Sequence, residues 1–279
     1  MEFIKLVIDI DDDYQETLIA ELDELDFEGF EQLDNRLIAY IPQARFNDVS
    51  RERIEQLLAA FPGDGIVHSE ELVADRNWNE AWEATIQAQQ IGRFFVKPTW
   101  SNETAQEGAI ELLIDPKMAF GTGYHETTRL MLRALPDVIA DDDRVLDAGT
   151  GTGILAIAAV KLGAAKAFGF DTDEWSYLNA RENTLLNDTG DAVTLMEGSI
   201  ETVPGQAEYD AVLANINRNV IVELLPALAA HLKTGGYLLL SGLLEGDREF
   251  IERQAALQAM EQLLVTQENE WICLLYRKS

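Results

Sequence analysis

The stretch VLDAGTGTGILAIAA, residues 145–159, decides the fold of this chain. A short apolar run ends at Asp147, and Gly149, Gly151 and Gly153 then lead into a segment rich in alanine and isoleucine. A strand, a glycine-rich turn and a helix in this order open a βαβ unit in which the backbone passes close beneath a ligand. The stretch therefore predicts a ligand site at the end of a strand that lies inside a sheet.

The segments around this stretch predict a doubly wound α/β domain of the Rossmann-like type over residues 116–279. Short, continuous apolar strands between helices are typical of a parallel sheet covered on both faces, with the ligand at the carboxyl ends of the strands. We expect strands at 144–149, 165–173, 192–198, 209–216 and 237–243, and one more at the sheet edge at 271–278. We expect helices at 126–135, 153–162, 174–187, 218–231 and 246–260.

Residues 1–74 predict a separate, small α+β domain. Its expected elements are a strand at 3–10, a helix at 14–25 capped by Asp13, two strands within 29–42 around a turn at Asp34–Asn35, a helix from Asp48 or Ser50, and a strand at 65–73. The order β-α-β-β-α-β is that of a ferredoxin-like module. This architecture hosts many functions, so it indicates a recognition domain and no particular chemistry.

Residues 75–115 are predicted to link the two domains. Residues 75–91 read as one polar helix with Trp78 and Trp82 on the same face, because these residues are four positions apart. Two short strands, 92–100 and 108–115, are expected to follow.

Composition narrows the class of protein. The 279 residues contain 50 Asp and Glu against 21 Lys and Arg, a formal net charge of −29. Such acidity disfavours direct binding of DNA, RNA or an anionic membrane, and it suits either a basic partner or solubility in a salty cytoplasm. One cysteine, no apolar stretch of membrane-spanning length and no signal-peptide pattern predict a cytoplasmic protein. We expect a monomer.

The glycine stretch alone does not distinguish two classes of cofactor. Gly151, Gly153 and Ala156 satisfy the dinucleotide pattern G-x-G-x-x-A. Asp147 separates the alternatives, because a carboxylate at the mouth of the loop would repel a pyrophosphate and attract the sulfonium and ammonium of S-adenosylmethionine (SAM). Asp171 ends the next strand, where an acid binds ribose hydroxyls in either case.

Asn215 is the candidate catalytic residue. It follows the apolar run of 209–214, so its side chain is expected to reach the ligand pocket. A carbonyl oxygen that accepts an N–H bond from an amine can aim the lone pair of that amine at a methyl donor without acting as a strong base. Asn217 is a second candidate, and for both residues the alternative role is to cap the helix that follows.

Several motifs together resemble the ribosomal protein L11 methyltransferase family. They are DPKMAFGTGYHETTRL (115–130), the glycine stretch extended to Ala164, DTDEWSYLNARENTLLN (171–187), ANI (214–216) and EWICLLYRK (270–278). The resemblance is close over residues 75–279, and AFGTGYHETT (119–128) is its most specific part, since SAM enzymes in general lack it. Glu126 departs from the proline that is usual in the family.

The resemblance implies a function and a set of contacts. It implies that Thr128, Gly149, Asp171 and Asn215 contact SAM, while Asp147, Gly151 and Phe120 complete the expected cofactor site. Phe120 is expected to lie in a lid-like loop over the cofactor. The resemblance also implies that the amino-terminal domain binds ribosomal protein L11, and that the enzyme methylates its amino groups, on lysine side chains, on the α-amine or on both.

Three alternatives stay open at this point. The chain can be an N-methyltransferase for another protein, a base or a small amine, a nicotinamide-dependent oxidoreductase that uses the glycine loop, or a SAM-binding module without catalysis. No metal is expected, because His125 has no Cys or His partner at ligand spacing.

Overall fold

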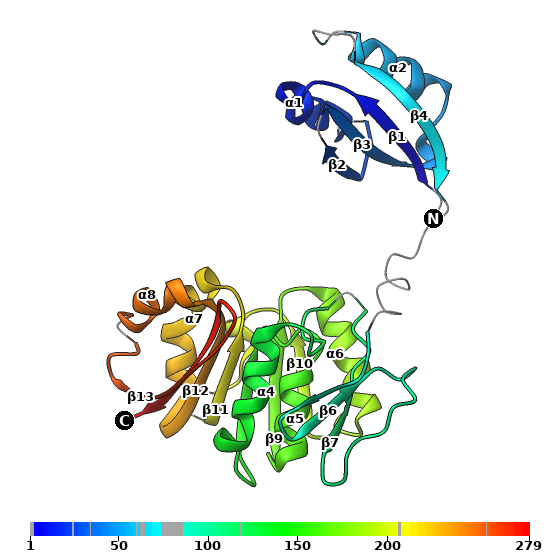
Figure 1. Cartoon of the computed structure of the whole chain (residues 1–279). Helices are drawn as coiled ribbons and strands as arrows, with labels where there is room; N and C mark the ends of the chain where they lie inside the picture. The colour runs from blue at the N-terminus through cyan, green and yellow to red at the C-terminus, as the bar shows by residue number, and fades with distance from the viewer. Residues whose placement is uncertain are drawn as a thin grey trace. The chain divides into compact units, whose positions relative to one another are not determined.

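The structure is a computed structural model that describes residues 3–23, 25–33, 35–59, 61, 65–73, 86–117, 119–205, 208–254 and 256–279. The chain forms two compact units, Met1–Trp78 and Asn79–Ser279 (Figure 1). Among the described residues, none of the helices combines the length and the apolar composition that crossing a bilayer requires.

The first unit is a four-stranded antiparallel sheet with two helices packed on one face. Alternate residues of β1, such as Leu6 and Ile8, are buried against Leu18 and Leu22 of α1 and Ile54 of α2. The sheet order is β2-β3-β1-β4, and the order along the chain is the predicted β-α-β-β-α-β. The elements are β1 (Phe3–Asp9), α1 (Asp12–Asp23), β2 (Gly29–Leu33), β3 (Arg36–Pro42), η1 (Gln43–Arg45), α2 (Asp48–Leu58) and β4 (Ile66–Val73).

Of the two helices in this unit, α2 starts at the predicted Asp48, while α1 starts earlier than predicted. Helix α1 begins at Asp12, so Asp13 lies inside it and does not precede it as a cap. Helix α2 begins at Asp48 and is capped by Asn47, whose side chain accepts hydrogen bonds from the amides of Val49 and Ser50 at 3.0 and 3.2 Å. Ser50 Oγ accepts in return from the Asn47 amide at 2.8 Å, which completes a capping box.

The second unit contains a seven-stranded sheet in the order β10-β9-β8-β11-β12-β14-β13. The first five strands of this order are parallel, and β14 is antiparallel to both of its neighbours. The strands are β8 (Arg144–Ala148), β9 (Lys166–Asp171), β10 (Val193–Glu197), β11 (Tyr209–Asn215), β12 (Leu232–Leu244), β13 (Met260–Glu268) and β14 (Trp271–Lys278). The helices are α4 (Glu126–Val138), α5 (Ile154–Leu162), α6 (Glu174–Leu186), α7 (Arg218–His231) and α8 (Arg248–Glu252), with short η2 (Ile200–Thr202) and η3 (Glu245–Asp247).

Both faces of this sheet are buried. Val145 faces the core shared with α4 and α5, while its neighbour Leu146 faces the core shared with α7 and α8, and both side chains are fully buried. This explains why the strands read as continuous apolar runs. The chain runs from β8 to β9 and β10 on one side, then returns to β11 on the other side of β8. A ligand crevice is expected at this switch point, outside the carboxyl ends of β8 and β11.

The carboxyl-terminal hairpin corrects two predictions. The helix expected at 246–260 is only α8, Arg248–Glu252, and the unexpected strand β13 begins at Met260. Since β13 takes the edge position, β14 lies inside the sheet and is not the edge strand. The β-branched pair Val265–Thr266 and the left-handed turn residue Asn269 (φ 52°) were the available signals of this hairpin.

The expected helix at 75–91 lies mostly outside the described residues, because 74–85 are not described. Its last part is not helical, since Gln89–Ile91 forms β5. Strand β5 pairs with β6 (Phe94–Lys97) through a turn at Gly92, and β6 pairs with β7 (Ile110–Leu113). Side chains from this small sheet lie in the core formed with α4 and α5.

Asn183 on α6 joins three segments of the second unit. It is fully buried. Its Oδ1 accepts from the Asp115 amide at 3.0 Å, and its Nδ2 donates to the carbonyl of Thr152 in the glycine loop at 2.9 Å. A buried side chain with these bonds holds the glycine loop against the segment that follows β7.

We therefore predict that Asn183→Ala lowers the free energy of unfolding by about 2–3 kcal/mol, because buried main-chain groups lose their partners. Urea unfolding of the full chain measures this change. Leu185→Ala, a truncation on the same helix at a side chain that is 71% exposed, is the control and should have little effect. Equal midpoints for the two variants would contradict the assignment.

Candidate functional site

The glycine loop that follows β8 has no room for a side chain at Gly149 or Gly151. Gly149, Gly151 and Gly153 have φ values of 68°, 55° and 82°, in the left-handed region. A Cβ on Gly149 would lie 2.3 Å from Cγ2 of Ile216, and one on Gly151 would lie 2.2 Å from the carbonyl oxygen of Phe120. The loop is therefore fixed by close contact with two other segments.

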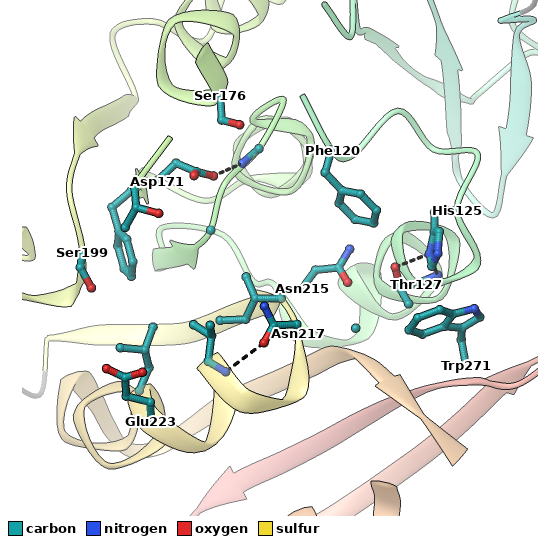
Figure 2. A pocket seen from close by; sticks show the side chains of 18 residues that line it. Phe120, His125, Thr127, Asp171, Ser176, Ser199, Asn215, Asn217, Glu223 and Trp271 are labelled. Carbon is teal, nitrogen blue, oxygen red and sulfur yellow. Dashed lines mark hydrogen bonds between the residues drawn. The ribbon is translucent and has the colours of Figure 1, made fainter. Parts of the chain in front are cut away.

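One of these segments is the 119–125 stretch that precedes α4. Thr152 of the glycine loop donates from its amide to the Phe120 carbonyl at 2.8 Å, and from its Oγ1 to the Gly121 carbonyl at 2.7 Å. These bonds tie the backbone of the expected lid to the loop beneath it. The side chain of Phe120 remains 51% exposed and projects over the crevice (Figure 2).

A cavity of about 640 Å³ lies at the carboxyl ends of β8, β9 and β11, where the switch point predicted a ligand. This volume is in the range of small-molecule sites. Of the residues predicted from the sequence, six line the cavity, namely Phe120, Gly149, Gly151, Asp171, Asn215 and the second candidate Asn217.

Asp171 is held in place at the end of β9. Its Oδ2 accepts from the Gly151 amide at 2.9 Å, and its Oδ1 accepts from the Asp173 amide at 3.1 Å. Each carboxylate oxygen has a second lone pair, so Asp171 can still accept hydrogen bonds from two neighbouring hydroxyls.

Asp147 lies beneath the glycine loop and not at its mouth, which differs from the sequence expectation. It is 1% exposed, and its Oδ2 accepts from Thr150 Oγ1 at 2.7 Å and from the Ala156 amide at 3.2 Å. Its Oδ1 has no hydrogen-bond partner in the described part of the chain. Burial raises the pKa of this carboxyl to about 6. The side chain points inward because the strand end at which it lies is buried beneath α5.

Asn215 presents an unpaired carbonyl oxygen at the end of β11. The side chain is 9% exposed, and its Nδ2 lies 3.4 Å from Thr128 Oγ1, to which it donates. No residue that the structure describes donates a hydrogen bond to Asn215 Oδ1. A buried acceptor without a donor is unfavourable unless a ligand supplies one. Thr128 does not line the cavity, and its neighbour Thr127 does.

Asn217 has the alternative role that the sequence left open. It is the N-cap of α7, and its Oδ1 accepts from the Val220 amide at 3.1 Å. Because that carbonyl is already engaged, Asn215 is the residue of the two with a free acceptor.

Three aromatic rings, those of Phe120, His125 and Trp271, lie together at the cavity wall beside Thr127 (Figure 2). His125 is the N-cap of α4, and its Nδ1 accepts from the Thr127 amide at 3.3 Å. The His125 ring meets the Trp271 ring edge-on, with centroids 4.7 Å apart, and lies 5.2 Å from the Phe120 ring. Glu126 does not line this cavity, and its Oε1 accepts from Asn269 Nδ2 at 2.9 Å.

Sequence reasoning missed several lining residues, among them Thr127, Ser176, Ser199, Glu223 and Gly242. Only Gly242 carried a signal, since an isolated glycine inside a strand indicates close approach of another backbone. A Cβ there would lie 2.1 Å from the Ile216 carbonyl oxygen. The others lie on loops or helix faces whose position depends on the packing of distant segments.

The charges of the lining residues favour a cationic ligand. Asp171 and Glu223 are carboxylates, and none of the described residues that line the cavity is Lys or Arg. A pyrophosphate would find no cation here, whereas SAM carries a sulfonium and an ammonium. The glycine loop and the free Asn215 oxygen also fit a ligand with ribose and amino groups.

Comparison with known proteins agrees with this geometry. Residues 4–279 match the family described as "Ribosomal protein L11 methyltransferase (PrmA)". The chain is 38% identical over 276 residues to a ribosomal protein L11 methyltransferase of Chlorobaculum parvum, covering 98% of this chain and 95% of that protein. It is 40% identical over 263 residues to one of Geobacter sulfurreducens, covering 92% of this chain and 86% of that protein.

A solved structure is similar as well. The crystal structure of a ribosomal protein L11 methylase from Lactobacillus delbrueckii subsp. bulgaricus matches with a TM-score of 0.64 and 30% sequence identity, over 70% of this chain and 100% of that chain.

The fold and the site together define a SAM-dependent methyltransferase with a doubly wound α/β domain. The chain belongs to the ribosomal protein L11 methyltransferase family. The nicotinamide-dependent oxidoreductase considered from the sequence is thereby set aside.

We predict that Gly151→Ala weakens binding of S-adenosylhomocysteine at least about tenfold, because the added Cβ displaces the Phe120 backbone. Calorimetric titration measures the affinity. Gly246→Ala is the control, since a Cβ there meets nothing within 4 Å. Unchanged affinity in Gly151→Ala would show that the contact between the loop and residues 119–121 does not shape the site.

The raised pKa of Asp147 predicts a pH-dependent stability. The folded state, with a pKa of about 6, holds the proton more tightly than the unfolded state, with a value of 3.8. This contribution to stability is therefore present below about pH 4 and is lost as the pH rises through about 6.

Relative to Asp147→Asn, the wild type should lose roughly 2–3 kcal/mol of unfolding free energy between about pH 4 and 7. Urea unfolding across this range tests it. Asp137→Asn, at an exposed carboxylate, should show no such pH-dependent difference.

Proposed function

We propose that this protein transfers methyl groups from SAM to amino groups of ribosomal protein L11, on lysine side chains, the α-amine or both. Membership of the family and the names of its relatives support L11 as the substrate. The chemistry of the site supports an amine as the acceptor.

The observation that carries this proposal is the buried, unpaired Oδ1 of Asn215 at the cavity wall. A neutral amine has N–H donors and one lone pair. When Asn215 Oδ1 accepts one N–H, the lone pair is restricted in direction and can be aimed along the line of methyl transfer. Thr128 acts through Asn215, because its hydroxyl accepts from the amide nitrogen and thereby fixes the orientation of the Asn215 side chain.

The other predicted residues are proposed to hold the cofactor. When bound, SAM supplies a methyl group that is already activated by a positively charged sulfur. Asp171 accepts hydrogen bonds from ribose hydroxyls, while the bare backbone of Gly149 and Gly151 allows close approach. Phe120 covers the site and excludes water. Asp147 supports the loop from beneath through Thr150 and the first turn of α5.

The amino-terminal unit is proposed to bind L11. A chain with a formal net charge of −29 attracts a basic-leaning protein partner and disfavours bare DNA. A cytoplasmic location and a monomeric state remain predictions from the sequence.

The proposal predicts that Asn215→Ala lowers kcat for methyl transfer to purified L11 by about 100-fold, a much larger effect than the one on the dissociation constant for S-adenosylhomocysteine. Transfer is measured by intact mass, in multiples of one methyl. Asn219→Ala is the matched control, at an exposed asparagine of α7 outside the cavity.

Acetylating the amines of L11 beforehand should abolish transfer to it. Continued transfer to the acetylated protein would refute an amine acceptor. Wild-type rates in Asn215→Ala would refute the role of Asn215. Methyl transfer to a different protein or to a small amine in an extract, without transfer to L11, would refute L11 as the substrate.

A further inference from the structure

Glu223 of α7 is a carboxylate at the cavity wall that neither the mechanism nor the fold uses. Val220, Glu223 and Leu224 all line the cavity, and their spacing of three and four residues places them on one face of the helix. Throughout the described ranges, no hydrogen bond or ion pair joins the Glu223 carboxylate to another residue, whereas Asp171 is bound to two amides.

The cavity has two distinct ends (Figure 2). At one end lie Thr127, His125 and Trp271, close to the free oxygen of Asn215. At the opposite end lie Ser199, which follows β10, and Glu223. In the view of Figure 2, Asp171 lies toward the Ser199 end, to the left of Asn215.

The order of the parts of SAM fixes which end takes the base. The sulfonium and amino-acid part, the ribose and the adenine follow one another along the molecule. With the reacting methyl near Asn215 and the ribose at Asp171, as the proposed function requires, the base extends to the end formed by Ser199 and Glu223. Phe170, Ile216 and Leu224 supply apolar surface at the cavity wall for a flat ring.

We propose that Glu223 is a cofactor-specificity residue that recognises the exocyclic amino group of adenine. This inference rests on the proposed function, in which the methyl group lies near Asn215 and the ribose at Asp171. A carboxylate only accepts hydrogen bonds, and the N6 amino group of adenine only donates them. Hypoxanthine carries a carbonyl oxygen at the same position, so a carboxylate facing it would place two acceptors against each other. Glu223 therefore selects adenine against 6-oxopurines.

Glutamine is the informative replacement. Its amide can accept from an amino group through Oε1, or turn and donate to a carbonyl oxygen through Nε2. Glu223→Gln should therefore keep much of the affinity for the adenine ligand while losing discrimination. Glu223→Leu should weaken binding of the adenine ligand, because the partner of its amino group is removed.

The test compares the binding of S-adenosylhomocysteine and S-inosylhomocysteine to the full chain by calorimetric titration, without turnover. We expect the wild type to prefer the adenosyl compound, and we expect Glu223→Gln to narrow the ratio of the two dissociation constants about tenfold or more. Glu201→Gln is the matched control, at an exposed carboxylate of η2 that does not line the cavity, and it should keep the wild-type ratio.

The outcomes separate this inference from the proposed function. If the wild type binds neither compound, the proposed function fails. If it binds the adenosyl compound and Glu223→Gln keeps the wild-type ratio, the role of Glu223 is overturned while the function stands. If Ser199→Ala narrows the ratio and Glu223→Gln does not, recognition of the base belongs to the Ser199 hydroxyl.

Discussion

The contact between the glycine loop and its two neighbours is the constraint on which the site depends. The amide of Gly151 donates to Asp171 at the end of β9, while a Cβ on the same residue would strike the Phe120 carbonyl. Three segments that are distant in sequence thus meet at distances that only glycine permits. Because each segment fixes the other two, the wall of the cavity is formed before any ligand binds. The loops then lose less conformational entropy when the ligand binds.

The second feature of the site is the difference in hydrogen bonding between the side-chain oxygens of Asn215 and Asn217. Asn215 and Thr128 bond to each other behind the cavity, and this leaves the Asn215 carbonyl oxygen buried without a donor. The side-chain oxygen of Asn217, two residues away, accepts from the Val220 amide as a helix cap. The protein tolerates an unfavourable acceptor at Asn215, which is typical of a position kept for ligand recognition rather than for stability.

Sequence reasoning worked where local pattern and global fold agree. The parallel strands and the glycine loop were predicted because residues such as Val145 and Leu146 are buried on opposite faces, which produces continuous apolar runs. It failed at β13, whose pairing with β14 is decided by tertiary contact more than by its mixed polar sequence. It also failed for Gln89–Ile91, where a polar stretch with helical character is a strand because Ile91 enters a core made by α4 and α5.

The sequence by itself determined the class of the second unit and the residues of the loop. The loop needs positive φ values that favour glycine, so the spacing of Gly149, Gly151 and Gly153 can be read directly from the sequence. Only the tertiary structure decided which groups face the ligand. It placed Asp147 beneath the loop and Thr128 behind Asn215, and it brought Thr127 and Glu223 to the cavity wall. The direction of a side chain at a strand or helix end depends on what packs against it, and those neighbours lie far away along the chain.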